Sequence, residues 1–240
     1  MKIVIENDYA SLSLRAAEII KAQVNGKPES VLGFATGSTP IGTYCELVKM
    51  YNANDVDFSK VVTFNLDEYY KIKKTDKQSY YHYMQTHLYR HVKFKETHIQ
   101  DGEAADHAAE CIAYEEEIAS HGGIDLQILG IGVEGHIGFN ESGDEFIAAT
   151  HHVKLDESTI KENSRFFENE NDVPKYALTM GIKTIFSAKK ILLLANGANK
   201  AEILQKTVHG AITPKNPSSI LQLHPDVTII TDREAGKLLV

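Results

Sequence analysis

VLGFATGSTP, residues 31–40, joins a short apolar run to a turn of small polar residues that ends in a proline. The continuous apolar run Val31–Ala35 is typical of a strand that is buried on both faces of a parallel sheet. Pro40 suits the first position of a helix, and Thr39 suits the N-cap before it. The stretch therefore predicts a buried strand followed directly by a helix, which is the repeating unit of an α/β fold.

The same alternation continues along the chain. Strands are predicted at Lys2–Ile5, Val31–Ala35, Val61–Leu66, Leu126–Gly130, Ile191–Ala195 and Val227–Thr231. Helices are predicted at Tyr9–Val24, Pro40–Asn52, Ser79–Tyr89 (with Ser79 as N-cap), Ala104–Ser120, Ala198–Thr207 and Ala235–Leu239. Strands that alternate with helices favour an open, mostly parallel twisted sheet with helices on both faces, a Rossmann-like three-layer sandwich. No Gly-, Ser- or Pro-rich linker divides the chain, so residues 1–240 are expected to form one α/β domain.

Composition narrows the class of function. The chain has 240 residues and a net charge of −8, which argues against nucleic acid because phosphate backbones require a basic face. No apolar run approaches the ~20 residues that span a bilayer, and the N-terminus lacks a secretory core. The two cysteines, Cys45 and Cys111, have neither metal nor disulfide spacing, and both are expected to be small buried residues of helices. These observations predict a cytoplasmic protein with a small-molecule ligand, and they leave the oligomeric state open.

Two turns at strand ends resemble anion sites. Thr36–Thr39 follows the second predicted strand, and Gly37 allows the backbone to approach a ligand closely. Asn196–Lys200 follows the fifth, and Lys200 lies in the first helical turn, where the helix dipole disfavours a cation. Each turn alone is equally an ordinary strand-to-helix connection. Together they favour a phosphate site.

Paired acids follow the third predicted strand in Asp67-Glu68-Tyr69-Tyr70. They are consistent with a general base and its neighbour, with a metal site, or with solvated charges. A carboxylate at the mouth of a parallel strand and walled by tyrosines would be partly desolvated, which raises its pKa. We favour the general base.

A glycine-rich loop follows the fourth predicted strand. Gly130, Gly132 and Gly135 fit the G-x-G-x-x-G dinucleotide fingerprint, but the residues that follow make a poor helix, so we reject a nicotinamide cofactor. The loop carries Glu134, His136 and Glu141, and a histidine between carboxylates is a common acid/base arrangement. No second His or Cys stands at ligand spacing in this loop, so we expect no metal here.

The segment Lys154–Lys175 is polar and has no strong period. Such a segment is either a solvated surface excursion or a lid over a site, and the pattern alone does not decide between them.

Five motifs in this order resemble the glucosamine-6-phosphate deaminase family. They are Thr36-Gly37-Ser38-Thr39-Pro40, Asn65-Leu66-Asp67-Glu68-Tyr69, Gly135-His136-Ile137-Gly138-Phe139-Asn140-Glu141, Asn163-Ser164-Arg165-Phe166-Phe167 and Leu221-Gln222-Leu223-His224-Pro225. The resemblance runs from the first strand to near the C-terminus. It implies conversion of glucosamine 6-phosphate to fructose 6-phosphate and ammonia, with neither a metal nor an organic cofactor.

The resemblance also implies roles for single residues. His136 would move the proton in sugar-ring opening, with Glu141 and Glu134 setting its orientation and charge, and Asp67 would remove the C2 proton. The implied phosphate cradle consists of Thr36, Gly37, Ser38, Thr39, Arg165 and Lys200, with Arg165 coming from the lid.

Two departures from the family pattern stand out. Position 134 is Glu, where family members carry Asp or Asn, which weakens the assignment of Glu134. Allosteric hexameric members have basic residues before the lid and a longer C-terminal tail, whereas this chain has His151 and Val153 and ends at Val240. We therefore expect a non-allosteric enzyme.

Two alternatives remain. One is a 6-phosphogluconolactonase of the same fold. In that enzyme a Ser-Leu-Phe-Pro type stretch would stand in place of Phe139-Asn140-Glu141, and the reaction would not need Asp67 as a carbon base. The other is a sugar-phosphate-sensing effector module, which would need a DNA-binding segment and would not need Asp67, His136 and Glu141 together.

Overall fold

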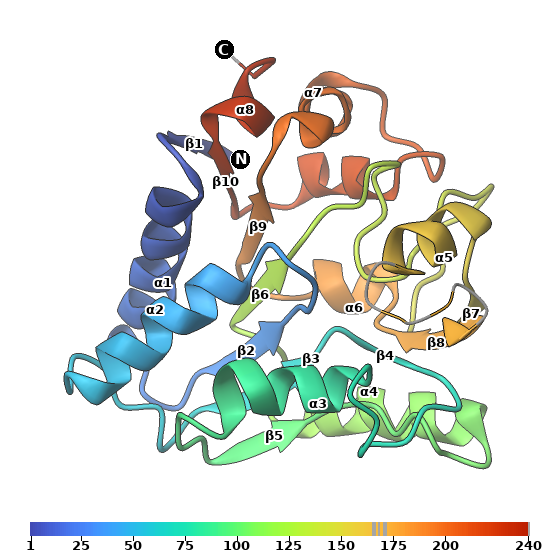
Figure 1. Ribbon diagram of the computed structural model, residues 1–240, viewed down its shortest axis with the longest axis horizontal. Coiled ribbons are helices and arrows are strands. Elements are labelled where there is room, and N and C mark those ends of the chain that lie inside the picture. The colour runs from blue at the N-terminus through green and yellow to red at the C-terminus, as the bar shows by residue number, and fades with distance from the viewer. Residues whose placement is uncertain (165–166, 168, 170–171, 240) are drawn as a thin grey trace.

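The computed structural model describes residues 1–164, 167, 169 and 172–239. Its centre is a seven-stranded parallel sheet in the order β1-β10-β9-β6-β2-β3-β5 (Figure 1). The strands of this sheet are β1 (Lys2–Glu6), β2 (Val31–Phe34), β3 (Val62–Asn65), β5 (Glu96–His98), β6 (Leu126–Leu129), β9 (Ile191–Ala195) and β10 (Val227–Asp232). The predicted open parallel sheet is confirmed, and all six predicted strands belong to it.

Helices cover both faces of the sheet. They are α1 (Tyr9–Gly26), α2 (Ile41–Asn52), α3 (Tyr80–Met84) continued by the π-helix η1 (Gln85–Tyr89), α4 (His107–Ser120), α5 (Glu157–Asn163), α6 (Ile182–Phe186), the 3₁₀ helix η4 (Ala198–Lys200) continued by α7 (Ala201–His209), the 3₁₀ helix η5 (Pro217–Leu223) and α8 (Arg233–Gly236). Among these described residues, no helix is long and apolar enough to cross a membrane.

Alternate residues of each strand serve opposite cores. Leu192 and Leu194 of β9 pack with α1, α2 and α3, while Ile191 and Leu193 pack with α4, α6 and α7. Because both faces of the inner strands are covered, these strands are mostly continuous apolar runs rather than alternating ones.

A second sheet, antiparallel and ordered β4-β8-β7, lies beside the first. Its strands are β4 (Asp67–Tyr69), β7 (His151–Lys154) and β8 (Tyr176–Thr179). The chain leaves the main sheet after β3, where the Leu66 N–H donates to the Phe34 carbonyl, and enters β4 at once. Asp67 therefore belongs to a strand of its own, β4, which the sequence did not predict.

Several helix starts differ from the prediction. Ser79 caps α3 as expected, accepting from the His82 N–H. In contrast, α2 begins at Ile41 with Pro40 as its capping residue and no side-chain cap, because the Thr39 hydroxyl donates instead to Asn196 Oδ1 at 2.8 Å. The last helix begins at Arg233, since Asp232 provides the cap that fixes its start.

One cysteine also differs from the prediction. Cys111 of α4 is buried as expected, but Cys45 is exposed, because it lies on the outer side of α2.

Candidate active site

A cavity of about 310 Å³ opens at the carboxyl ends of the central strands. Residues after β2, β3, β6 and β9 line it, and β2 and β6 are neighbours at the point where the strand order reverses direction. Ligands of open α/β sheets bind at such a switch point. The fold therefore delivers four successive strand ends to one cavity.

The two predicted anion turns meet in this cavity. Thr36–Thr39 and Lys200 are part of the lining, and the Thr39–Asn196 hydrogen bond ties one turn to the other. Gly37 and Gly197 have φ angles of 93° and 89°, a region that favours glycine.

Tyrosine hydroxyl groups form hydrogen bonds with the backbone carbonyl groups of the first turn, Thr36–Thr39. Tyr83 donates to the Gly37 carbonyl at 2.6 Å, and Tyr9 lies 3.1 and 3.0 Å from the carbonyls of Ser38 and Thr39. Because carbonyl oxygens repel anions, engaging them elsewhere leaves the turn better suited to a phosphate group.

Asp67 lies on the cavity wall with only 5% of its surface exposed. Burial, followed by the nearby Glu68 charge, holds the pKa of Asp67 well above its ordinary value. Gly138 of the histidine loop lies beside the Asp67 carboxylate, with a φ of 59° and only 2.8 Å between an added Cβ and Thr179 Oγ1, so glycine is required there. The structure thus provides a buried carboxylate with the raised basicity that the sequence predicted.

Glu68 has a different environment from its neighbour. Its carboxylate accepts from the backbone N–H groups of Tyr69, Tyr80 and Tyr81 at 2.8 to 2.9 Å. Burial raises the pKa of Glu68 to about 7, although these three bonds favour the ionised form. Its oxygens hold the start of α3 and, with it, Tyr80, which lines the cavity.

The glycine-rich loop places His136 in the lining of the same cavity. The Gly132 N–H donates to the His136 carbonyl at 3.0 Å, and the imidazole packs so closely on Gly132 that an added Cβ would lie 2.1 Å from it. His136 Nδ1 lies 3.5 Å from Glu141 Oε2. A carboxylate at this distance can stabilise the imidazolium form and orient the ring.

Glu141 is itself nearly buried, with 9% of its side chain exposed. Burial raises the pKa of Glu141 to about 7, and a hydrogen bond from Thr159 of α5 works in the opposite direction. Its charge therefore changes near neutral pH, directly beside His136.

Three predicted site residues are not found in the cavity lining. Glu141 is outside the lining and reaches the cavity only through its contact with His136. Glu134 is exposed and outside the lining, and its carboxylate lies 3.4 Å from the Ser158 hydroxyl of α5. Its catalytic role stays a prediction. Arg165 lies outside the described residues.

Besides Tyr80, four further polar lining residues were not predicted as site residues. Thr159 and Asn163 come from α5, and Asn196 and Asn199 come from the second turn. Asn163 stands in one of the motifs quoted above, and Asn196 and Asn199 lie within a predicted turn, so the signals were present. Thr159 had none, because only the fold brings α5 to the cavity.

A family model described as glucosamine-6-phosphate isomerases/6-phosphogluconolactonase matches residues 7–230. The chain belongs to this family. Among members of the isomerase/lactonase family, it is 54% identical to glucosamine-6-phosphate deaminases of Clostridium novyi and Clostridium acetobutylicum, in each case over the full length of both chains.

Solved structures of the isomerase/lactonase family have the same fold as this chain. A structure described as a monomeric glucosamine-6-phosphate deaminase superposes with a TM-score of 0.96 at 44% identity, covering 99% of this chain and 100% of that one. A 6-phosphogluconolactonase from Trypanosoma cruzi has a TM-score of 0.79 at 20% identity over 100% of this chain and 97% of that one, which shows a common fold.

Proposed function

We propose that this chain is a glucosamine-6-phosphate deaminase, which converts glucosamine 6-phosphate and water to fructose 6-phosphate and ammonia. The observation that carries the proposal is one cavity shared by a buried carboxylate, Asp67, by two anion turns and by His136, which contacts Glu141 outside the lining. The names of relatives at 54% identity support the same reaction.

The substrate phosphate binds at the two turns. Thr36–Thr39 and Lys200 line the cavity, the Thr39–Asn196 hydrogen bond joins the two turns, and their hydroxyl, N–H and ammonium donors suit a phosphate. The family resemblance adds Arg165, which lies outside the described residues, to this cradle. With Thr159 and Asn163 of α5 already at the cavity, residues 154–175 act as its lid.

Ring opening is the first chemical step. His136 takes the proton from the C1 hydroxyl and returns one to the ring oxygen, so that the C1–O5 bond breaks and an open-chain aldehyde forms. Glu141 stabilises the imidazolium that exists between these two transfers.

Asp67 then acts as the carbon base. Its carboxylate removes the C2 proton while the C1 carbonyl oxygen gains one, which gives an enolamine with a hydroxyl on C1 and the amino group on C2. Protonation at C1 converts the enolamine to a C2 iminium ion. Water adds to C2, and ammonia leaves to give the C2 ketone.

The lactonase alternative does not use this arrangement. Hydrolysis of a lactone breaks an acyl–oxygen bond and requires no proton removal from carbon. Burial that raises the basicity of Asp67 would then serve no step. An effector module would likewise have no use for Asp67 and the His136–Glu141 pair together.

Three further properties belong to this proposal. The chemistry is complete with side chains alone, so no cofactor takes part. Substrate saturation is hyperbolic and the enzyme non-allosteric, which agrees with the monomeric state described for the 44%-identical structure. The reaction takes place in the cytoplasm, where free cysteines such as Cys45 and Cys111 stay reduced.

The proposal is tested by incubating the purified protein with glucosamine 6-phosphate and measuring ammonia and fructose 6-phosphate together. Equimolar release of both, with a hyperbolic dependence on substrate, is expected. Turnover of 6-phosphogluconolactone without ammonia release would support the lactonase, and sigmoidal kinetics that become hyperbolic with N-acetylglucosamine 6-phosphate would contradict the non-allosteric state.

A further inference from the structure

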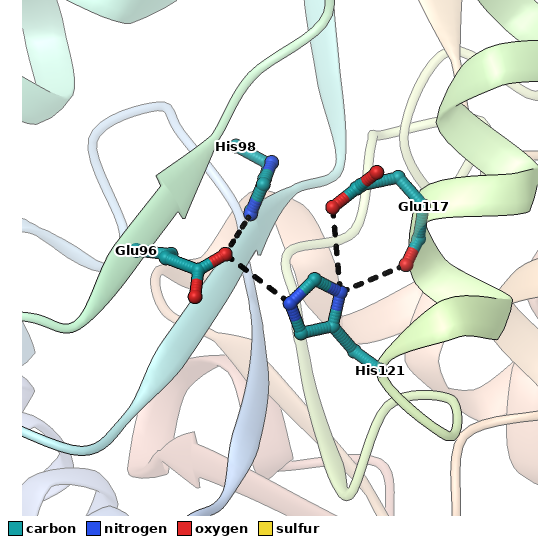
Figure 2. A group of neighbouring side chains, drawn as sticks. All are labelled: Glu96, His98, Glu117 and His121. Atoms are coloured by element: carbon teal, nitrogen blue, oxygen red, sulfur yellow. Dashed lines mark hydrogen bonds and ion pairs between the residues drawn. The ribbon is translucent and has the colours of Figure 1, made fainter.

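Two histidines and two glutamates gather away from the cavity. Glu96 and His98 lie two residues apart on β5, so they share one face of that strand, and Glu117 and His121 lie one turn apart at the end of α4. One ligand atom from each of the four lies within 4.8 Å of the others. Figure 2 shows the four side chains gathered between the strand and the end of the helix. None of the four lines the cavity described above.

Two of the distances between these ligand atoms match those of a metal polyhedron. Glu96 Oε2 lies 3.3 Å from His121 Nε2 and 3.4 Å from His98 Nε2. Ligands held at about 2.0 to 2.1 Å in a zinc tetrahedron are about 3.3 Å apart. A carboxylate oxygen and two imidazole nitrogens are also typical zinc ligands.

Hydrogen bonding to His121 is compatible with a lone pair on Nε2. Its Nδ1 lies 2.9 Å from the Glu117 backbone carbonyl and 3.2 Å from the Ser120 hydroxyl, and its Nε2 faces the Glu96 carboxylate. A neutral imidazole has only one N–H to donate. If Nδ1–H donates to the carbonyl, Nε2 presents its lone pair to the centre of the cluster, which is the usual arrangement of a metal-bound histidine.

His98 presents the same situation. Its Nε2 is buried from solvent and makes no hydrogen bond within the described residues, although the Glu96 carboxylate lies 3.4 Å away. The His98 ring stacks on the Phe64 ring with centroids 4.6 Å apart, and the His121 ring packs edge-on against the same Phe64 ring. Phe64 therefore fixes both imidazoles before any ligand arrives.

The surroundings of the cluster also suit a cation. His121 is the C-cap of α4, and the carbonyl end of a helix attracts positive charge. The Lys95 ammonium group contacts Glu96 through Oε1 at 3.1 Å, which leaves Oε2 for the centre of the cluster. Glu117 is 45% exposed and can turn its carboxylate inward as a fourth ligand.

We propose that Glu96, His98 and His121, with Glu117 as the fourth ligand, form a structural binding site for Zn²⁺. The ion clamps β5 to the end of α4. Strand β5 is at the edge of the sheet and pairs with β3 over only three residues, so it has few bonds of its own. The sequence offered a possible metal site only at Asp67-Glu68 and in the glycine-rich loop, and the site proposed here contains no residue of either.

The experiment measures Zn²⁺ binding and thermal unfolding of the purified, chelator-treated full chain. We expect one saturable site that His98→Gln and His121→Gln each weaken by at least about tenfold. With free Zn²⁺ at about 100 times Kd, the unfolding midpoint should rise by roughly 5 to 10 °C. Co²⁺ in place of Zn²⁺ should give the visible absorption of a tetrahedral site.

The matched control is His209→Gln, which alters an exposed histidine on α7 and should leave binding and the rise unchanged. Circular dichroism and ammonia release, which should be unaffected by Zn²⁺, establish that each variant is folded. If a histidine variant fails to fold, Glu96→Gln, at a half-exposed position, takes its place. No saturable binding by the wild type, or binding and a midpoint rise that survive these substitutions, would overturn the proposal.

Discussion

The adjacent acidic residues Asp67 and Glu68 have different surroundings. Asp67 faces the cavity, whereas Glu68 directs both oxygens to backbone N–H groups at the start of α3. A sequence shows two neighbouring carboxylates and cannot show which one is engaged. The engagement of Glu68 also adds a second buried charge beside Asp67, which contributes to the raised pKa of Asp67.

Glu141→Gln tests the electrostatic role of the residue beside His136. The pKa of Glu141 is raised to about 7, so its charge is present above that pH and absent below it. The variant has no charge at any pH. We expect kcat to fall about 100-fold at pH 8 and much less at pH 6, because the wild-type residue is then protonated and neutral. A wild-type to variant ratio of kcat that stays constant across this range would contradict the assignment.

Gly132→Ala tests the position of the imidazole without altering any polar group. The added Cβ would lie 2.1 Å from the His136 ring, so the ring must move. A displacement of about 1 Å lowers kcat by about 100-fold, while the circular dichroism spectrum should be retained. Gly26→Ala is the control, since nothing lies within 4 Å of its added Cβ. Equal kcat values for the two variants would show that the ring position is unimportant.

At the scale of elements, the sequence predicted those with a strong apolar pattern. Each central strand is a continuous apolar run that only a doubly covered sheet explains, and all six were found. Strand β5 was missed because Glu96-Thr97-His98 is polar and short, and it is stable only as an edge partner of β3. The small sheet was missed because β4 consists of Asp67, Glu68 and Tyr69, residues whose burial depends on contacts distant in sequence.

The candidate active site could be predicted in part from the sequence, for the same reason. Turns that follow strong strands could be placed at one edge of the sheet, so Thr36–Thr39, Asp67, His136 and Lys200 were expected near one another. Thr159 could not be placed, because the path of the chain from β7 into α5 depends on tertiary packing. The proposed zinc site has a spacing of two residues on β5, Glu96 and His98, and of four residues at α4, Glu117 and His121. The sequence could have predicted it only if β5 and α4 were known to be neighbours.

The lid belongs to this scale as well. If α5 closes over bound substrate, amides of residues 154–164 should exchange with deuterium several-fold more slowly in the presence of an unreactive open-chain hexitol phosphate. Amides of α1, which contributes no residue to the cavity lining, are the internal control and should not change. Equal exchange of residues 154–164 with and without the ligand would identify the segment as a surface excursion.

For the whole molecule, the buried carboxyl group lowers stability near neutral pH. The folded-state pKa of Asp67 lies above its ordinary value of 3.8, so the folded protein retains a proton that the unfolded chain releases. Its contribution to the free energy of unfolding is therefore greatest below pH 3.8 and declines as the pH rises towards the folded-state pKa.

The Asp67→Asn variant lacks this decline of the free energy of unfolding with rising pH. We expect the variant to be more stable than the wild type at pH 8, by about 1 to 2 kcal/mol in urea unfolding, with a smaller gain at pH 5.5. Ser142→Ala, a change outside the cavity lining, is the control for a general effect of substitution. A variant that is less stable than the wild type at pH 8 would show that the carboxylate is well accommodated by its surroundings.

The central claim is that Asp67 removes the C2 proton of the substrate. It is tested most directly by following loss of deuterium from glucosamine 6-phosphate labelled at C2, by NMR, with the wild type and with Asp67→Asn. The variant should release the label about 1,000-fold more slowly, while its Kd for an unreactive hexitol phosphate stays within about threefold of the wild type. Release of the label at a comparable rate by the variant would contradict the account.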